Sequence, residues 1–155
     1  MLNRFFICMV ALALMLQFAY ALPKRDINTI VKFHNKYRKL HGVPPLKWDK
    51  KVAQYAQNYS EKCVFQHSYG PYGENMAMNY PSWASIVDGW YSEVGHYNYT
   101  DPGLTSLHFT QIVWKDTTKV GCGLTKCPGG PITFCSYDAP GNVIGTFTSN
   151  VFPPK

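Results

Sequence analysis

The sequence lacks the motifs that mark several common classes of enzyme and nucleic-acid-binding protein. It has no G-x-S-x-G nucleophile elbow and no H-E-x-x-H zinc motif, which are typical of serine hydrolases and metalloproteases. It has no nucleic-acid-binding module, no internal repeat and no low-complexity tract. Its 155 residues suffice for one domain with a hydrophobic core but hardly for two. We therefore expect a single domain that is not an enzyme and does not bind nucleic acid.

Residues 1–21 have the pattern of a secretory signal peptide. An early Arg4 is followed by an apolar run and by the small-residue cleavage pattern Ala19-Tyr20-Ala21. The alternative is a membrane-spanning helix, for which the apolar run is at the short end. We expect cleavage, and hence a secreted, extracellular protein. N-glycosylation acts on exported proteins, and the sequence has two sequons for it. Asn58 and Asn98 are therefore predicted acceptors.

Basic residues outnumber acidic ones, with 15 Lys and Arg against 9 Asp and Glu and a formal net charge of +6. Lys24-Arg25 is a dibasic pair. Cleavage after it would make residues 22–25 a short propeptide. The equally weighted alternative is that the two residues are only a solvated charge pair. Residues 26–155 are then the expected domain. Lysines cluster early in it and would suit an anionic membrane surface, although such a run is more often only a solvated face.

Four cysteines remain when Cys8 leaves with the signal peptide. This even number predicts two disulfides in an exported chain. The alternative, a zinc site made of four thiolates, is weak because the sequence has no C-x2-C spacing.

Residues 119–139 predict a β-hairpin around a Pro-Gly-Gly turn. With the turn placed directly after Cys127, Cys122 faces Cys135, and Cys127 points to the other side of the sheet because strands have a period of two. We therefore prefer the pairs Cys122–Cys135 and Cys63–Cys127. The pairing of Cys63 with Cys122 and of Cys127 with Cys135 fits this register less well.

Apolar residues at helical spacing predict four helices before or beside this hairpin. The first three begin after Asp26, Asp49 and Pro81-Ser82, and the fourth covers 105–115. Residues 76–80 are a candidate short strand, and the chain after the hairpin reads as irregular. Helices combined with an antiparallel hairpin indicate the α+β class.

Few ionisable side chains stand in apolar surroundings, and those that do are His67, Glu74, Glu93 and His108. Two imidazoles, each oriented by a carboxylate, are able to bind a divalent cation. The alternative, which the residues alone favour, is a polar network in which each Glu anchors a His. The other histidines are expected at the surface or at helix ends: His34, His41 and His96.

Four segments resemble, in order, the motifs of one family. "HFTQIVWKDTTKVGCG" and "FCSYDAPGNVIG" resemble the two signatures of the CAP superfamily, which contains cysteine-rich secretory proteins, venom allergens and plant pathogenesis-related class 1 proteins. "HSYGPYGEN" and "WYSEV" match two further family segments. The resemblance covers residues 26–146, nearly the whole chain after the signal peptide.

The resemblance implies a three-layer α-β-α sandwich with about four helices around a small antiparallel sheet and a large central cleft. It places His67, Glu74, Glu93 and His108 on the family's cleft tetrad. The two histidines match residues that bind Zn²⁺ or Mg²⁺ in some members. Gln111 matches the polar residue beside them.

The resemblance also implies ligands. In fungal and plant members the loop between the third and fourth helices binds sterols, and fatty acids bind between the first and fourth helices. Here the loop offers four candidate contacts: Tyr97, Tyr99, Pro102 and Leu104. The alternatives are that these tyrosines only pack the loop, and that the protein acts in defence or virulence through a protein receptor. A hydrolase is the least expected. Many plant members carry two further cysteines before the first signature, which this sequence lacks, so the loop is held less tightly.

Overall fold

The computed structural model describes residues 22–155. The predicted signal peptide, residues 1–21, lies outside the described residues. The elements follow in the order α2 (Lys24–Leu40), β1 (Lys47–Trp48), α3 (Lys50–Ser60), β2 (Gly73–Met78), α4 (Trp83–Ser92), the 3-10 turn η1 (Glu93–His96), α5 (Leu107–Val113), β3 (Lys119–Cys127), β4 (Gly130–Asp138) and α6 (Phe147–Asn150). No helix in this part of the chain combines the length and the apolar character needed to cross a bilayer.

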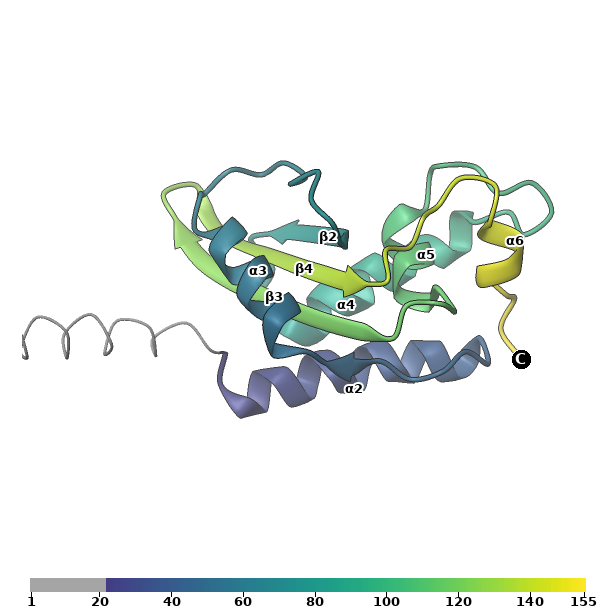
Figure 1. The fold of residues 1–155 in the computed structure, drawn as a ribbon, viewed down its shortest axis with the longest axis horizontal. Coiled ribbons are helices and arrows are strands. Elements are labelled where there is room, and N and C mark those ends of the chain that lie inside the picture. Colours follow the sequence, from purple (N-terminus) through teal and green to yellow (C-terminus); the bar gives the residue numbers. More distant parts are fainter. Residues whose placement is uncertain (1–21) are drawn as a thin grey trace, which may run out of the picture.

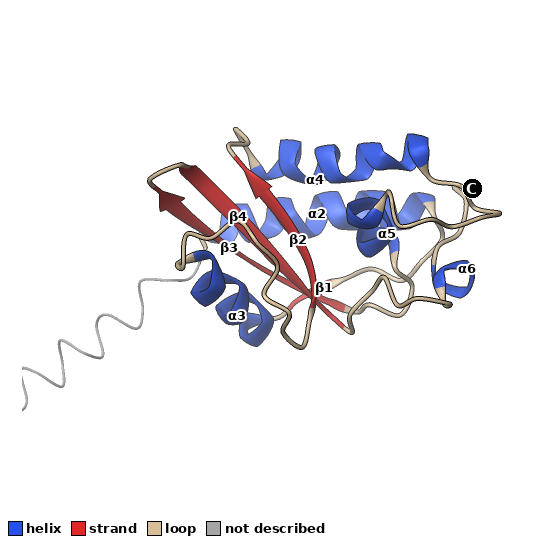
Figure 2. Ribbon diagram, turned by 90° about the horizontal axis from the view of Figure 1, so that it is seen from above, coloured by secondary structure: helices blue, strands red, loops and turns tan. Residues whose placement is uncertain are grey.

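A sheet of four strands in the order β1-β3-β4-β2 forms the middle layer (Figure 1). β3 pairs antiparallel with β4, β4 pairs antiparallel with β2, and the short β1 runs parallel to β3. Helix α3 covers one face, and α2, α4 and α5 gather on the other (Figure 2). The predicted α+β class and the α-β-α sandwich are confirmed.

Close contact between α3 and β3 explains two glycines of the hairpin. A Cβ atom at Gly121 would lie 2.1 Å from the Ala53 nitrogen, and one at Gly123 would lie 2.3 Å from the Gln57 Cα. Only glycine allows a helix backbone this near to a strand. The close approach also allows Gln57 Oε1 to accept a hydrogen bond from the backbone N–H of Leu124 at 3.0 Å.

The hairpin has the predicted register. Cys122 is paired with Cys135 across the strands, and Cys127 stands opposite Gly130. Disulfides join Cys122 to Cys135 and Cys63 to Cys127, so the preferred pairing is confirmed. The second disulfide ties the chain beyond α3 to the end of β3.

Element bounds differ from the prediction at several points. Helix α2 begins at Lys24, so Asp26 lies in its first turn and is not its cap. Asp49 and Ser82 cap α3 and α4 as expected. Strand β2 begins at Gly73, three residues before the candidate strand, because it pairs with β4 along its whole length. β1 and α6 were not predicted; both are very short elements.

Two histidines expected at the surface or at helix ends are fully buried, although His41 does stand at a helix end, directly after α2. His34 donates from Nδ1 to the carbonyl of Ile30 at 2.8 Å, and its Nε2 lies 2.9 Å from the Tyr137 hydroxyl. His41 lies 2.6 Å from the carbonyl of Phe152 and also contacts Tyr91. Burial lowers the pKa of His34 to about 4 and also lowers that of His41, because a charged imidazole loses its hydration. His96 is exposed as expected.

Candidate functional site

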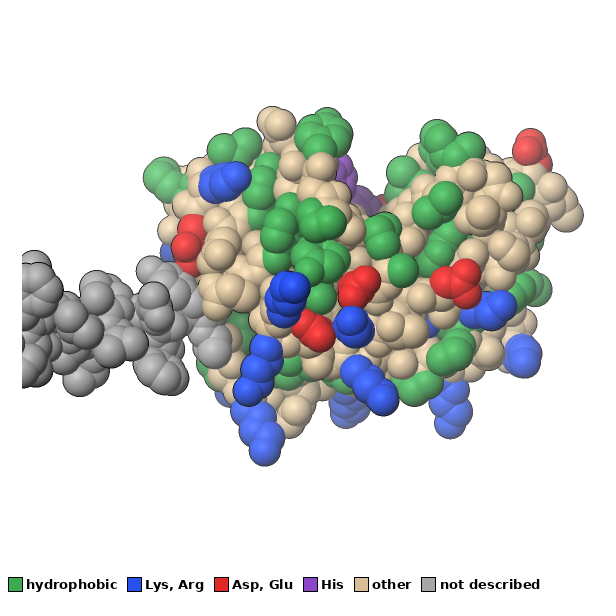
Figure 3. All heavy atoms as spheres, in the orientation of Figure 1, with side chains coloured by type: hydrophobic (Ala, Val, Ile, Leu, Met, Phe, Trp, Pro, Cys, Tyr) green, Lys and Arg blue, Asp and Glu red, His purple; other side chains and the backbone are tan. Residues whose placement is uncertain are grey.

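One cavity of about 310 Å³ brings together side chains from four separate elements. His67 lies in the segment after α3, Glu74 on β2, Glu93 at the end of α4 and His108 on α5. The remaining lining residues are Asn75, Leu104, Thr105, Leu107 and Asn142. The cavity opens where the space-filling view shows a hollow with histidine atoms in it (Figure 3).

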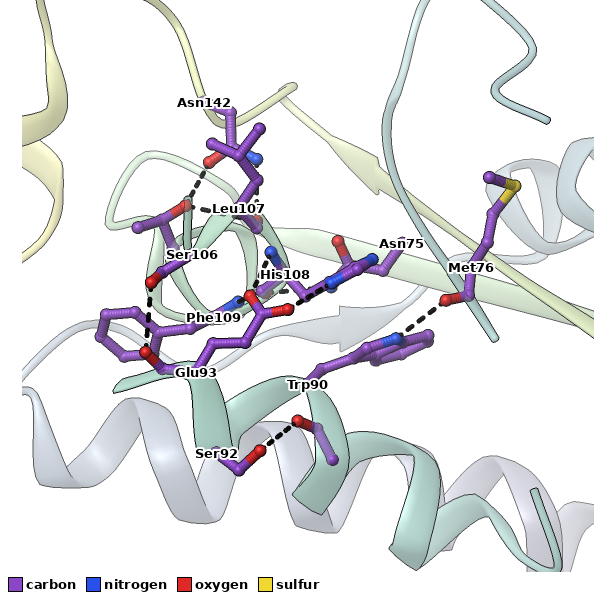
Figure 4. Close-up of polar contacts among 12 residues, drawn as sticks. Asn75, Met76, Trp90, Ser92, Glu93, Ser106, Leu107, His108, Phe109 and Asn142 are labelled. Carbon is purple, nitrogen blue, oxygen red and sulfur yellow. Dashed lines mark hydrogen bonds and ion pairs between the residues drawn. The ribbon is translucent and has the colours of Figure 1, made fainter. Parts of the chain in front are cut away.

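Each histidine of the cavity is paired with one carboxylate. His67 Nδ1 donates to Glu74 Oε2 at 3.0 Å. His108 Nδ1 donates to Glu93 Oε1 at 2.6 Å (Figure 4). A carboxylate bound at Nδ1 fixes the neutral tautomer that carries its lone pair on Nε2. Neither Nε2 atom has a hydrogen-bond partner within residues 22–155.

Helix α5, which carries His108, is short and is held at both ends by charged side chains from other helices. Ser106 precedes it without a capping bond from its own side chain. Glu93 Oε2 serves instead, accepting from the backbone N–H groups of His108 at 3.0 Å and Phe109 at 3.2 Å. Ser106 Oγ donates in return to the Glu93 carbonyl. These bonds satisfy N–H groups that a helix start leaves unpaired.

The other end of α5 is held by Arg38 of α2, which is fully buried. Its guanidinium donates to the carbonyls of Ile112 at 2.9 Å, Trp114 at 2.8 Å and Thr117 at 2.8 Å. Its Nε donates to the carbonyl of Pro44 at 2.6 Å. Burial lowers the Arg38 pKa to about 10, so the group stays charged at neutral pH. Arg38 therefore satisfies carbonyls that the helix end would leave unpaired.

Glu74 holds the segment that carries His67. Its carboxylate accepts from the Ser68 backbone N–H at 2.9 Å and from the Ser68 hydroxyl as well as from the imidazole. The Ser68 hydroxyl also contacts Tyr55 at 2.7 Å. Ser68 thus faces a carboxylate and a phenol, and it forms no Ser–His pair.

Two imidazole nitrogens with carboxylates behind them are donors of the kind that a divalent cation takes. Within residues 22–155, no group of three or more His, Cys, Asp or Glu side chains is placed to hold a metal ion. Two protein ligands leave most coordination positions to water, which is typical of a loosely held ion.

Gln111 does not line the cavity, which corrects the expectation that it faces the cleft. It is fully buried, and its Oε1 accepts from the Gly141 backbone at 3.0 Å while its Nε2 donates to Thr117. It holds the segment after β4, which carries Asn142 into the cavity. Asn142 in turn accepts from Thr110 and donates to the carbonyl of Leu107.

The predicted lipid-binding loop is only partly available to a ligand. Tyr97 is buried and packs against Phe109 and Tyr99, with ring centroids 5.4 and 4.8 Å apart. Its ring therefore belongs to the core. Burial raises the Tyr99 pKa to about 12. Leu104 is 59% exposed and lines the cavity, and Pro102 is half-buried.

Both sequon asparagines are exposed, and N-glycosylation stays a prediction. Asn58 lies within α3, where its Oδ1 accepts from Gln54 at 2.7 Å. Asn98 lies in the loop, and its Oδ1 accepts from the hydroxyl of Thr100 at 2.8 Å.

Four cavity residues were not predicted from the sequence: Asn75, Thr105, Leu107 and Asn142. Asn75 stands directly after Glu74 on β2, so the strand period of two assigns it to the opposite face. The only sequence signal for Asn75 is that it belongs to the segment "HSYGPYGEN", which resembles a family motif. Asn142 lies in an irregular segment, where no periodicity indicates a direction.

The sequence model of the cysteine-rich secretory protein family matches residues 31–137. The chain belongs to this family. It is 48% identical over 138 residues to Protein PRY2 of Saccharomyces cerevisiae, covering 83% of this chain and 42% of that protein. It is 44% identical over 128 residues to Secreted protein RBT4 of Candida albicans, covering 76% of this chain and 36% of that protein. The chain thus spans less than half the length of these two relatives.

The fold is also found in a solved member of the family. The structure of Schistosoma mansoni venom allergen-like protein 4 superimposes with a TM-score of 0.67 and 26% sequence identity. The match covers 86% of this chain and 97% of that one.

Proposed function

We propose that this chain is a secreted, non-enzymatic lipid-binding protein that binds sterols, and that its cavity holds Zn²⁺ or Mg²⁺ loosely. The signal-peptide pattern, the two disulfides and the similarity to a relative named as a secreted protein support export. The Ser68 hydroxyl, which faces Glu74 rather than an imidazole, and the pairing of all four cysteines of residues 22–155 support a non-enzymatic role.

The distribution of exposed apolar side chains carries the lipid proposal. Eight large hydrophobic side chains are exposed in the described part of the chain. Six of them lie on the three segments that border the cavity: Val64, Phe65, Tyr69, Leu104, Val143 and Ile144. Apolar side chains gather on both sides of the hollow in Figure 3. We call these six residues the apolar rim.

Exposed apolar patches of this kind mark sites of interaction. A sterol is flat, rigid and almost entirely apolar, so it loses little conformational entropy when the rim covers it. Leu104 and Pro102 of the predicted loop remain candidate contacts. Tyr97 belongs to the core and supports the loop by packing against Phe109 and Tyr99.

Most Lys and Arg side chains in Figure 3 lie on its lower side, where Figure 1 has α2, and away from the hollow. An anionic membrane surface is therefore a second proposed partner, which that side would contact. A protein receptor for the rim is the alternative function, and fatty acids are the alternative lipid.

The test is equilibrium binding of labelled cholesterol and ergosterol to the exported protein, with and without chelator. The variant Leu104→Ser/Ile144→Ser removes apolar area from the rim. Leu40→Ser is the matched control, because Leu40 is also exposed but lies at the end of α2. Saturable binding that the rim variant loses and the control keeps would support the proposal. No sterol binding by the unaltered protein would overturn it and favour a fatty acid or a receptor.

A further inference from the structure

The apolar rim lies in three stretches of chain that contain no Asp, Glu, Lys or Arg: 64–72, 102–107 and 139–146. Charged residues make up 15% of the sequence, so their absence from all three stretches distinguishes this surface from the rest of the chain. The basic side chains in Figure 3 lie mostly on the lower side, away from the hollow that the rim borders. The molecule therefore has an uncharged apolar side and, away from it, a basic side.

Hydrogen bonds hold two of these stretches in place beside the cavity. In the first stretch, the Ser68 N–H donates to Glu74 Oε2 at 2.9 Å. In the third stretch, Asn142 Nδ2 donates to the Leu107 carbonyl at 2.9 Å. The apolar side chains next to these anchors are therefore exposed on fixed segments rather than on loops that are free to fold over and cover them.

Tyr69 is the most exposed member of the rim, and its backbone is in the left-handed region. The residue is 86% exposed and its φ is 55°. This conformation is uncommon for a bulky residue and persists only where the surroundings impose it. Here the Gly70 N–H donates to Ser68 Oγ at 3.0 Å, and Ser68 is itself bound to Glu74, so the turn around Tyr69 is fixed. The fold thus accepts a local cost and presents this ring to the outside.

The chemistry of the rim suits the surface of a zwitterionic bilayer better than a protein partner. Protein interfaces make about one hydrogen bond per 100–200 Å² and are enriched in Arg, whereas the rim stretches offer no charged side chain. A zwitterionic bilayer requires no counter-charge, and its lipids adapt to a surface that a cavity interrupts. Tyrosine is enriched at the boundary between membrane and water, because its ring is apolar and its hydroxyl is polar.

The rim is also continuous with the cavity. Leu104 is 59% exposed and belongs to the rim, and the same residue lines the cavity. A lipid that leaves a bilayer in contact with the rim would therefore reach the cavity without crossing water. Attraction of the basic side to anionic lipids would instead turn the rim away from the membrane.

We infer that the apolar rim docks this protein on zwitterionic membranes, with its exposed side chains inserted at the level of the headgroups and the mouth of the cavity toward the bilayer. The inference extends the lipid part of the proposed function by naming the surface that the protein contacts. Docking itself needs no sterol, so vesicles without sterol test it separately from sterol binding.

The experiment is flotation of the intact protein with vesicles of phosphatidylcholine alone, at low and at high salt. We expect binding that salt does not weaken, because no ion pair contributes to it. Phe65→Ser/Ile144→Ser removes apolar side chains from two of the three stretches and is expected to lower partitioning by about 10-fold or more. Leu40→Ser/Tyr80→Ser is the matched control, because these residues are 42% and 43% exposed but lie outside the rim.

Tryptophan fluorescence identifies the docked side directly. Ile144→Trp places an indole at a rim position that is 80% exposed, and Leu40→Trp places one outside the rim. With vesicles of brominated phosphatidylcholine, we expect a blue shift and quenching for Ile144→Trp beyond those of the unaltered protein, and no added change for Leu40→Trp. Neither substitution removes apolar area, so this measurement tests the inference even where the serine variant does not fold.

Salt-insensitive binding that the rim variant loses and the control keeps would support the inference. Binding only to vesicles that contain phosphatidylserine, lost at high salt and unchanged in the rim variant, would overturn it in favour of the basic side. No vesicle binding, with sterol binding in solution retained, would overturn the docking and leave the proposed function. Vesicle binding through the rim without sterol binding would support the docking and overturn the sterol proposal.

Discussion

Glu93 contacts His108 through both oxygens of its carboxylate. Oε1 accepts from the imidazole Nδ1 at 2.6 Å, and Oε2 accepts from the backbone N–H at 3.0 Å. One side chain therefore fixes the orientation of the ring and the start of the helix that carries it. The position of the imidazole in the cavity and the stability of α5 are coupled through this carboxylate.

Glu93→Gln should lower the free energy of unfolding by about 1–3 kcal/mol, because the amide replaces one acceptor by a donor that faces a backbone N–H. Chemical denaturation at neutral pH measures the change. Glu61→Gln is the control, since Glu61 is exposed at the end of α3 and should change stability by at most about 0.5 kcal/mol. Equal effects of the two substitutions would contradict the capping role of Glu93.

Arg38→Lys should destabilise the protein by about 3–5 kcal/mol, although it conserves charge. A single ammonium group cannot reach the carbonyls of Ile112, Trp114 and Thr117 together, and it would be left buried and partly unpaired. The thermal midpoint and the denaturation midpoint should both fall. Arg25→Lys is the control on the same helix, because the Arg25 side chain is 92% exposed. A small effect at Arg38 would show that water replaces the lost contacts.

The predictions from sequence succeeded where the signal is local. The register of β3 and β4 follows from the turn after Cys127 and the period of two, and it fixes both disulfides. The caps at Asp49 and Ser82 are equally local, because a cap acts within three residues.

The errors arise where partners lie far apart in the chain. His34 is buried because Tyr137, 103 residues away, completes its hydrogen bonds. The sequence predicted that Tyr97 offers its ring to a ligand, but in the fold the ring packs against Phe109. No periodicity in the sequence carries information of this kind.

The stability of the protein should fall below pH 6.5 because of His34. Burial lowers its pKa from 6.5 to about 4 in the folded state. Between these values the unfolded chain binds more protons than the folded one, so the free energy of unfolding decreases as the pH falls, by up to about 3 kcal/mol at pH 4. His41, whose pKa is also lowered, acts in the same direction.

Comparison of unfolding curves between pH 7 and pH 4 isolates this contribution. His34→Gln should cost stability at pH 7 but flatten the dependence on pH in this window. His96→Gln, at an exposed position, should leave the dependence as in the unaltered protein. An unchanged slope in His34→Gln would mean that other groups cause the acid loss.

The two disulfides should differ in their effect on the cavity. Cys63–Cys127 closes 64 residues and Cys122–Cys135 closes 13, so chain entropy alone assigns them about 4 and about 3 kcal/mol. Cys63→Ala/Cys127→Ala also releases the segment that carries His67. Hydrogen exchange should therefore speed up in residues 61–72 in this variant. The Cys122→Ala/Cys135→Ala variant should leave exchange there slow, and equal protection in both variants would contradict the anchoring role.

His108→Ala should abolish most zinc affinity while the protein is still exported. The substitution removes one of two imidazole ligands and leaves Glu93 Oε2 on the backbone of α5, so the helix start is kept. We expect at least about a 100-fold loss in a zinc titration. His96→Ala is the matched control, because it removes an exposed imidazole outside the cavity. Unchanged zinc affinity in His108→Ala would place the ion elsewhere. Equal losses in both variants would mean that zinc binds histidines at the surface without selecting the cavity.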